Sequence, residues 1–441
     1  MLQALTALML AGIIFGIALR RPQTAVVVLL ALVPFHGLLA IAPVTGTYWK
    51  ELSVLAIVTA SFITPQRDEG YRAHLQWAAP LAILVPFGIV SALVAHGTGA
   101  FFPIKIAFFY LLLLLVIARF PFTARDKHRL ITVILLTGTL TAAYGIAQQV
   151  LQGEALVDMG YKWGEQVRTT GPLLRSFGTF NQPFPFGLYL MVALITGLSA
   201  SVLEPGRTRS RAFWPAATLM LPALVLSVVR ASYIGLLVGL FVLGATQHPK
   251  IMKALQATIA VGAAGILTLL ALFSGNGKLG ALFSSSSLMQ RLSHWTDSFK
   301  LVLVNPLGTG LGNTGSSAEK AGPGVDPLHP PYQPDNQYLK IMLELGFVGM
   351  ALYIAIVALM VCALLQLLRQ LPTRSVDYAF VCIALAATAA ACVAGVFATY
   401  LEIFPLEILF WVLPAIACCA PVNAHLTDSP ATTAAPATAA R

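Results

Sequence analysis

The sequence predicts an all-α protein that crosses a membrane many times. Hydrophobic residues make up 58% of the 441 positions and charged residues only 10%, whereas a soluble chain of this length needs far more charge to cover its surface. Apolar runs of about 20 residues recur, each long enough to cross about 30 Å of hydrocarbon. These runs lack the alternation of barrel strands. Helices are therefore the expected spanning elements, because they satisfy their backbone polar groups inside the lipid.

The apolar runs predict about 12 to 13 transmembrane helices, the count depending on short runs such as 52–64. In order along the chain they cover residues 2–19, 24–44, 52–64, 77–95, 101–118, 130–151, 184–203, 213–229, 231–247, 251–274, 338–368, 378–399 and 405–420. The first run is followed by Arg20 and Arg21, which flank a retained helix rather than a cleaved signal. We expect residues 1–422 to form a single transmembrane bundle and the Ala/Thr/Pro-rich residues 423–441 to be a disordered cytoplasmic tail.

The lysines and arginines predict the orientation of the bundle. One set of loops contains 16 of the 27 positive residues and 6 of the 17 acidic residues, a net charge of +10, and the remaining residues have a net charge of 0. The positive side is expected to face the cytoplasm, which explains the basic pI without a nucleic-acid partner. Its positive residues are Arg20, Arg21, Arg67, Arg72, Arg119, Arg125, Lys127, Arg129, Arg207, Arg209, Arg211, Lys250, Lys253, Arg369, Arg374 and Arg441.

Two long loops, 152–183 and 274–336, then lie on the periplasmic side of a bacterial inner membrane. Loops longer than about 15 residues are usually functional or disordered. The second loop contains an expected amphipathic helix at 287–304, which we expect to lie on the membrane surface as a cap. The apolar stripe of this helix would consist of Leu292, Trp295, Phe299, Leu301 and Val302.

Three arginines on this outer side suggest an anion site. Arg230 stands between two apolar runs in SVVRASYIGLLVGL, where an arginine is costly unless it is paired or lines a wet cavity. Arg175 directly precedes a helix, and Arg291 opens the amphipathic segment. A planar guanidinium binds the oxygens of a diphosphate in pairs, so these three side chains could hold one together. For each arginine alone, the alternative is a snorkelling or salt-bridged side chain.

A second polar cluster occupies the segment HPPYQPDNQYLKIMLELGFVG. Asp335 or His329 could act as general base for a sugar hydroxyl, because either can accept a proton near neutral pH when its environment tunes it. Asp335 has an alternative role as the N-cap of the following helix. Lys340 and Glu344 are interpreted as an ordinary i,i+4 pair.

Several neighbours of these groups are further candidates for the site, namely Asn336, Tyr338, His294 and Asn181. Tyr338 could, together with Trp163 and Trp295, provide a platform for a sugar or a lipid. Aromatic residues of this kind are also common as anchors at the membrane interface.

Other chemistries find no support in the sequence. The run NPLGTGLGNTG lacks the G-x-G-x-x-G spacing of a dinucleotide loop, and its glycines instead predict tight turns that bring the loop back over the active face. No His/Cys/Asp set has the spacing of a zinc site, so we expect no metal and no cofactor. All five cysteines fall inside apolar runs, where cysteine behaves as a small hydrophobic residue.

Four segments in order resemble the O-antigen ligase and polymerase (Wzy/WaaL) superfamily. They are RSFGTFNQPFPFGLYL, VRASYIGLLVG, RLSHWTDSFKLVLVNPLGTGLG and DNQYLKIMLELGFVG, and together they cover roughly residues 170 to 355. The resemblance implies a metal-independent, inverting glycosyltransferase of the GT-C kind. It would take a glycan from undecaprenyl diphosphate on the periplasmic side and pass it to a lipid A-core or other glycan acceptor. A chain-length regulator is a further implied partner.

One position departs from the pattern of the family. Its ligases typically carry a histidine followed by Asn, Ser or Gln, then nine residues and G-x-x-G. In this chain Asn336, Gly346 and Gly349 fit, but Asp335 stands in place of the histidine. This departure favours a polymerase or an exopolysaccharide relative over a lipid A-core ligase.

The residues are also consistent with the implied chemistry. Undecaprenyl diphosphate is already a good leaving group, so the protein need only stabilise its charge, align the acceptor and assist one deprotonation. The competing class is a lipid-linked glycan flippase or another transporter. A carrier typically has ionisable groups near the bilayer midplane and inverted repeats. Here the helix centres are almost free of charge and no duplicated halves are evident, which favours an enzyme.

Overall fold

The computed structural model describes residues 2–67, 69–170, 173–247, 285–315, 317–318 and 334–422. Within residues 285–304 it describes the side chains of residue 293 and of residues 295–304. Several expectations lie outside the described part of the chain, namely the span 251–274, the tail 423–441, the candidate base His329 and the side chains of Arg291 and His294.

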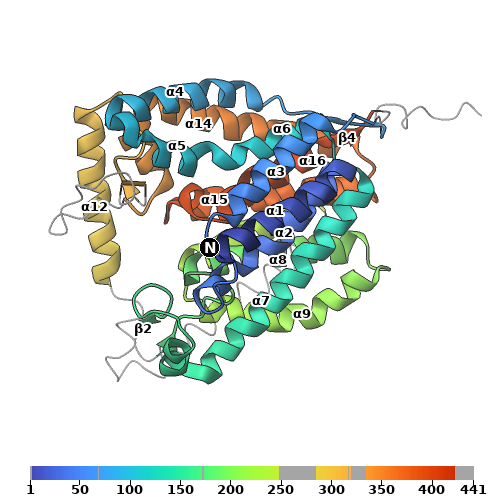
Figure 1. Ribbon diagram of the computed structural model, residues 1–441, viewed down its shortest axis with the longest axis horizontal. Helices are drawn as coiled ribbons and strands as arrows, with labels where there is room; N and C mark the ends of the chain where they lie inside the picture. Colours follow the sequence, from blue (N-terminus) through green and yellow to red (C-terminus); the bar gives the residue numbers. More distant parts are fainter. Residues whose placement is uncertain are drawn as a thin grey trace, which may run out of the picture.

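Helices provide almost all of the regular structure in the described residues (Figure 1). The α-helices are α1 (Leu2–Arg20), α2 (Pro22–Leu32), α3 (Trp49–Ile63), α4 (Ala78–His96), α5 (Phe101–Phe108), α6 (Leu112–Arg119), α7 (Ala124–Asp158), α8 (Pro183–Leu203), α9 (Thr208–Leu226), α10 (Arg230–Thr246), α12 (Ser285–Val304), α14 (Gln337–Gln370), α15 (Val376–Ala394) and α16 (Leu406–Ala417). The 3-10 helices are η1 (Val33–Ala40), η2 (Gly97–Ala100), η3 (Phe109–Leu111) and η4 (Tyr400–Glu402). The strands form two short antiparallel pairs, β1 (Tyr71–Ala73) with β4 (Cys419–Pro421) and β2 (Thr169–Thr170) with β3 (Leu173–Leu174).

The described helices confirm the predicted fold class. Among the described residues, seven helical segments are long and apolar enough to cross a membrane, and one of them, Ala78–Arg119, combines α4, α5 and α6. The apolar helices α10 and α16 are shorter. Each expected span other than 251–274 coincides with a helix or a run of helices. The protein is therefore an all-α, multi-pass membrane protein.

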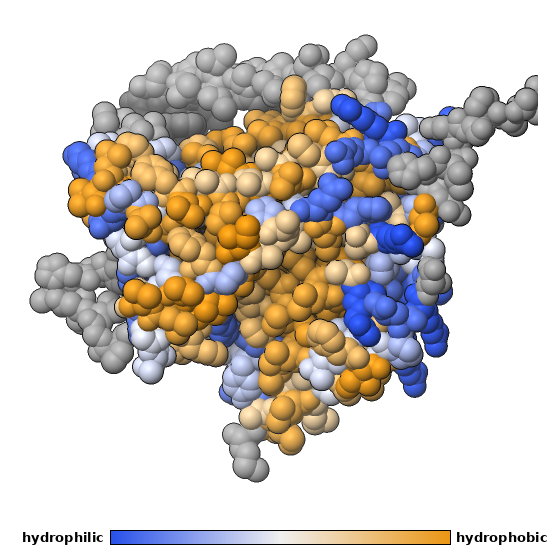
Figure 2. Space-filling model, turned by 90° about the horizontal axis from the view of Figure 1, so that it is seen from above, coloured by the Kyte–Doolittle hydropathy of each residue, from blue (hydrophilic) through white to orange (hydrophobic). Residues whose placement is uncertain are grey.

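Ion pairs and hydrogen bonds connect the segments at one end of the bundle. We call this end the basic face. Lys127 is fully buried, and its ammonium donates to Asp377 Oδ1 at 2.7 Å and to the Cys419 carbonyl at 2.5 Å. Arg21 reaches Asp126 at 3.1 Å. In the same region β1 pairs with β4, at the right of Figure 1. Figure 2 shows hydrophilic residues gathered towards this side of a mostly apolar surface.

The other end of the bundle, called the opposite face below, is covered by α12, which runs steeply across the ends of α4 and α14 at the left of Figure 1. Helix α12 confirms the amphipathic helix expected in the second long loop, although it begins at Ser285. The expected stripe was wrong in part. Trp295, Ser298 and Val302 face inward, whereas Phe299 and Leu301 are 47% and 44% exposed. The helical period places 295, 298 and 302 on one side, with 299 at the edge of that side and 301 farther from it.

Helices α8 and α15 lie at the centre of the bundle, with 83% of each span buried. Helix α10 packs antiparallel against α15, because Gly239 and Gly235 bring its backbone close to that helix. A Cβ added at Gly239 would lie 3.5 Å from the Ala386 carbonyl oxygen, and one added at Gly235 would lie 3.1 Å from that of Ala390. Extending this register by five residues brings the beginning of α10 to the end of α15 at the opposite face.

Candidate functional site

Asp335 directly precedes the N-cap of α14 and lies at the opposite face. The N-cap of α14 is Asn336, whose Oδ1 accepts from the backbone N–H groups of Tyr338 at 2.9 Å and Leu339 at 3.1 Å. The capping role considered for Asp335 was therefore wrong by one residue. Asp335 is exposed, its φ is +45°, and its carboxylate forms no hydrogen bond or ion pair with any residue that the structure describes.

The residues after the cap attach α14 to the end of α15. The Gln337 N–H donates to the Gly395 carbonyl at 2.8 Å, and the Gln337 side chain accepts from the Leu401 N–H at 3.0 Å. The Tyr338 hydroxyl donates to the Cys392 carbonyl at 2.8 Å, so this ring faces the bundle. Asp335 therefore lies beside the same end of α15 as the beginning of α10.

Arg175 lies in a loop that is hydrogen-bonded to a side chain of α7. Gln148 of α7 is fully buried, and its side-chain oxygen accepts from the N–H groups of Phe177 at 3.1 Å and Gly178 at 2.9 Å. Its Nε2 donates to the Gly178 carbonyl at 2.9 Å. The backbone N–H of Ser176 donates to the Leu226 carbonyl at 2.9 Å, which fastens the same loop to the end of α9.

Arg175 and Arg230 lie near one another at the opposite face. The Arg175 Nε donates to the Ser227 carbonyl at 3.4 Å, three residues before Arg230. Burial lowers the pKa of the Arg175 guanidinium, and the positive charges of Arg168 and Arg230 lower it further. A half-buried cation in a positive environment is stabilised by a bound anion. Arg168 was not singled out from the sequence, although it lies in the same loop.

Arg230 is the first residue of α10 and follows a strained turn. Val228 has φ +53°, an unusual value for a β-branched residue. Such strain persists only where the surrounding structure enforces it, and it is most common at functional sites. Arg230 is exposed and belongs to the positive end of the α10 dipole. The turn therefore places the Arg230 cation at the positive end of a helix.

The remaining candidates surround this region. Asn181 is exposed just before α8, and the loop before it is fixed by a hydrogen bond from the Thr179 hydroxyl to the Pro34 carbonyl at 2.7 Å. Trp163 is 54% exposed. The Trp295 ring lies 6.4 Å from that of Phe397, which follows α15, so α12 packs against the same end of that helix.

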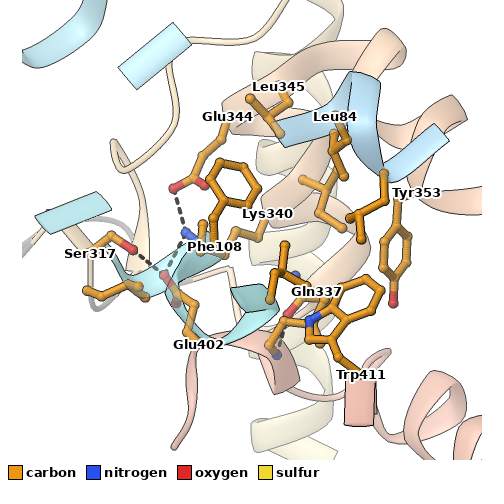
Figure 3. A pocket seen from close by; sticks show the side chains of 16 residues that line it. Leu84, Phe108, Ser317, Gln337, Lys340, Glu344, Leu345, Tyr353, Glu402 and Trp411 are labelled. Atoms are coloured by element: carbon orange, nitrogen blue, oxygen red, sulfur yellow. Dashed lines mark hydrogen bonds and ion pairs between the residues drawn. The ribbon is translucent and has the colours of Figure 1, made fainter. Parts of the chain in front are cut away.

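Sequence reasoning missed a buried charged cluster beneath Asp335. The Lys340 ammonium lies 2.5 Å from Glu344 Oε1 and 2.9 Å from Glu402 Oε1 (Figure 3), and all three side chains are at most 5% exposed. The i,i+4 pair expected for Lys340 and Glu344 is present, but it is buried and shares its ammonium with Glu402, which was not expected. The available signal was the presence of Lys340 and Glu344 inside an apolar run, which is rare without a specific partner.

The cluster holds the glycine-rich segment 305–315 against α14. Glu344 Oε1 accepts from the Thr314 N–H at 3.1 Å and from its hydroxyl at 2.9 Å, and Lys340 donates to the Thr314 carbonyl at 2.9 Å. Ser317 donates to Glu402. Residues of the cluster line one side of a cavity of about 70 Å³, with Tyr353 and Trp411 on another side (Figure 3).

The same segment packs against a break in α14. Gly346 has φ +63° and ψ −163°, which interrupts the helix and frees the carbonyls before it. The Thr309 N–H donates to the Leu343 carbonyl at 2.7 Å, and the Gly310 N–H donates to that of Glu344 at 3.0 Å. The glycines at 308, 310, 312 and 315 all have positive φ. The tight turns predicted for NPLGTGLGNTG are thus confirmed.

The described residues contain no group of three or more His, Cys, Asp or Glu side chains that could hold a metal ion. The fold and this polar end define a multi-pass membrane protein whose ionisable side chains converge at the end of a buried helix. The model of the Wzy_C family, described as O-antigen ligase, matches residues 215–354. This match agrees with the resemblance to the O-antigen ligase/polymerase superfamily that the motifs predicted. The match covers Arg230, Asp335 and Gly346, whereas Arg175 precedes it. No curated protein matches the chain.

Proposed function

We propose that the protein transfers a glycan from undecaprenyl diphosphate to an acceptor sugar hydroxyl at the periplasmic face of a bacterial inner membrane. The family match over residues 215–354 indicates an O-antigen ligase or polymerase type of function. The observation that carries the finer proposal is the arrangement of Arg175 and Arg230 on one side of the end of α15, with the open carboxylate of Asp335 also beside that end.

In this proposal, the diphosphate of the donor binds at the beginning of α10. Arg175 and Arg230 supply two guanidinium groups, and the positive end of the helix dipole adds to the attraction for an anion. An anion there offsets the mutual repulsion of the two cations and the cost of burying Arg175. Arg291 of α12 is a third candidate for this role.

Asp335 acts as the general base or orients the acceptor. It accepts the proton of the acceptor hydroxyl as the oxygen attacks the anomeric carbon. The bond from that carbon to the phosphate oxygen breaks, and undecaprenyl diphosphate leaves with the electron pair. This single displacement inverts the anomeric configuration and requires no metal. His329 is the alternative base.

The orientation rests on the charge asymmetry of the loops. The basic face contains the lysines and arginines that favour the cytoplasm. The opposite face, with α12 and the polar cluster, then faces the periplasm. The resemblance to the superfamily implies that the lipid-linked donor is used on that side.

An assay on purified protein in liposomes tests this function. An undecaprenyl-diphosphate glycan and an acceptor glycan are supplied, and both released undecaprenyl diphosphate and elongated acceptor are measured. We expect Arg230→Ala to abolish transfer and Arg374→Ala, at the basic face, to leave it unchanged. Movement of the intact donor across the bilayer without bond cleavage would instead identify the protein as a lipid-linked glycan flippase.

The choice of acceptor separates a ligase from a polymerase. Asp335 in place of the family's histidine favours a polymerase or exopolysaccharide enzyme, which elongates a glycan that is itself lipid-linked. The same assay with lipid A-core as the acceptor tests the ligase. Transfer to lipid A-core at the rate of transfer to the lipid-linked glycan would contradict this preference.

A further inference from the structure

Two adjoining hollows lie between α7 and α9 near the basic face, remote from the proposed transfer site. The first, of about 630 Å³, is lined largely by basic side chains, among them Arg125, Arg129 and Arg207. The second, of about 570 Å³, is lined almost entirely by apolar side chains. Both are lined in part by Thr132 and Arg209, so the two hollows form one continuous groove.

The basic hollow has more positive charge than its own carboxylates neutralise. Arg209 pairs with Glu204, and Arg207 approaches the same carboxylate at 3.6 Å. Arg129 reaches only Asp126, at 4.0 Å. The exposed Arg125 forms no hydrogen bond or ion pair with any part of the chain that the structure describes. A bound anion would neutralise the excess positive charge of this hollow.

The apolar hollow continues from the basic one along the helix axes. On α7 it is lined by residues 132, 135, 136 and 139, and on α9 by 212, 213, 215, 216 and 219, which are helical spacings along two adjacent ridges. Leu136 is 58% exposed and Leu219 is 38% exposed on the outside of the bundle. In a membrane-spanning bundle this surface contacts acyl chains.

We propose that this groove binds an anionic phospholipid of the leaflet at the basic face. Its phosphodiester lies among Arg125, Arg129 and Arg207, and one acyl chain lies along the apolar hollow. A free phosphate would leave the apolar part empty, and a zwitterionic lipid would leave the excess positive charge uncompensated. The proposal rests on the membrane fold and does not depend on the transfer reaction.

Native mass spectrometry of the detergent-purified full chain tests the site with phosphatidylglycerol and phosphatidylcholine as probes. Wild-type protein should retain phosphatidylglycerol preferentially. Arg125→Gln with Arg129→Gln should weaken its retention on the order of thirtyfold, since each arginine near a lipid surface contributes about 1 kcal/mol. The matched control, Arg369→Gln with Arg374→Gln, removes the same charge from the basic face outside the groove and should change retention much less.

A second set of measurements separates a lipid from its headgroup. Ala216→Trp fills the apolar hollow without altering charge and should also reduce retention. Ala212→Trp, at an exposed position in the same hollow, serves if the first variant does not fold. Soluble glycerophosphoglycerol should not compete with the lipid. Equal retention in the two arginine pairs, full retention in the tryptophan variants, or competition by the free headgroup would each overturn the proposal.

Discussion

Replacement of Gly346 by alanine tests whether the break in α14 holds the glycine-rich segment in place. The backbone of Gly346, at φ +63° and ψ −163°, lies in a region that residues other than glycine rarely enter. A Cβ added there would lie 2.3 Å from the Pro306 carbonyl oxygen and 2.5 Å from the Leu307 carbonyl carbon. These are backbone atoms, so the segment itself would have to move.

The structure sets the expected magnitude. If the segment stays in place, the strained backbone costs about 1–3 kcal/mol and the overlap a similar amount. If it separates at the break, at least three backbone hydrogen bonds are lost, from Thr309 to Leu343, from Gly310 to Glu344 and from Phe347 to Pro306. Each contributes about 0.5–1.5 kcal/mol. Either route lowers the free energy of unfolding by about 2–5 kcal/mol.

Thermal denaturation in detergent, followed by intrinsic fluorescence, measures the loss of stability, and amide hydrogen exchange across 305–315 reports separation of the segment. The control is Gly12→Ala on α1, where an added Cβ meets nothing within 4 Å and alanine improves helix propensity. If Gly346→Ala denatures like the control and keeps the amides of 305–315 protected, our account of the break is refuted.

Three further variants test the site. Lys340→Met leaves two buried carboxylates without their cation and should lower the free energy of unfolding by about 3–5 kcal/mol. Adding Glu402→Gln in a double variant should restore part of this loss. If the melting shifts of the two variants are additive, the residues are not directly coupled. Asp335→Asn should lower turnover much more than donor binding, whereas unchanged turnover in the transfer assay would remove Asp335 from the chemistry. Gln148→Leu removes three hydrogen bonds to the loop of Arg175 and should weaken donor binding in a titration without changing expression. Wild-type affinity in this variant would show that the loop does not need these hydrogen bonds.

The sequence predicted the features that depend on composition and local pattern. Apolar runs predicted nearly all of the described helices because length and hydrophobicity suffice to define a span. The glycines of NPLGTGLGNTG predicted turns because positive φ is a property of single residues. The resemblance, drawn over roughly 170 to 355, was confirmed by the family match over residues 215–354.

The sequence could not predict contacts between distant segments. Glu402 is 58 residues beyond Glu344, so no local rule joins it to Lys340, and the spacing of Lys340 and Glu344 suggested only an ordinary i,i+4 pair. The N-cap was wrong by one residue because Asp335 and Asn336 are both good capping types. Only the backbone geometry distinguishes them.

The pairing of β1 with β4 has a topological consequence. It joins Arg72 to Ala420 in one ladder, and the Val422 N–H donates to the Gly70 carbonyl at 2.9 Å. The two strands must therefore lie in the same compartment, so the chain traverses the bilayer an even number of times between them. A thiol-reactive probe at a cysteine introduced at Arg72 would consequently assign the sidedness of both segments in one labelling experiment.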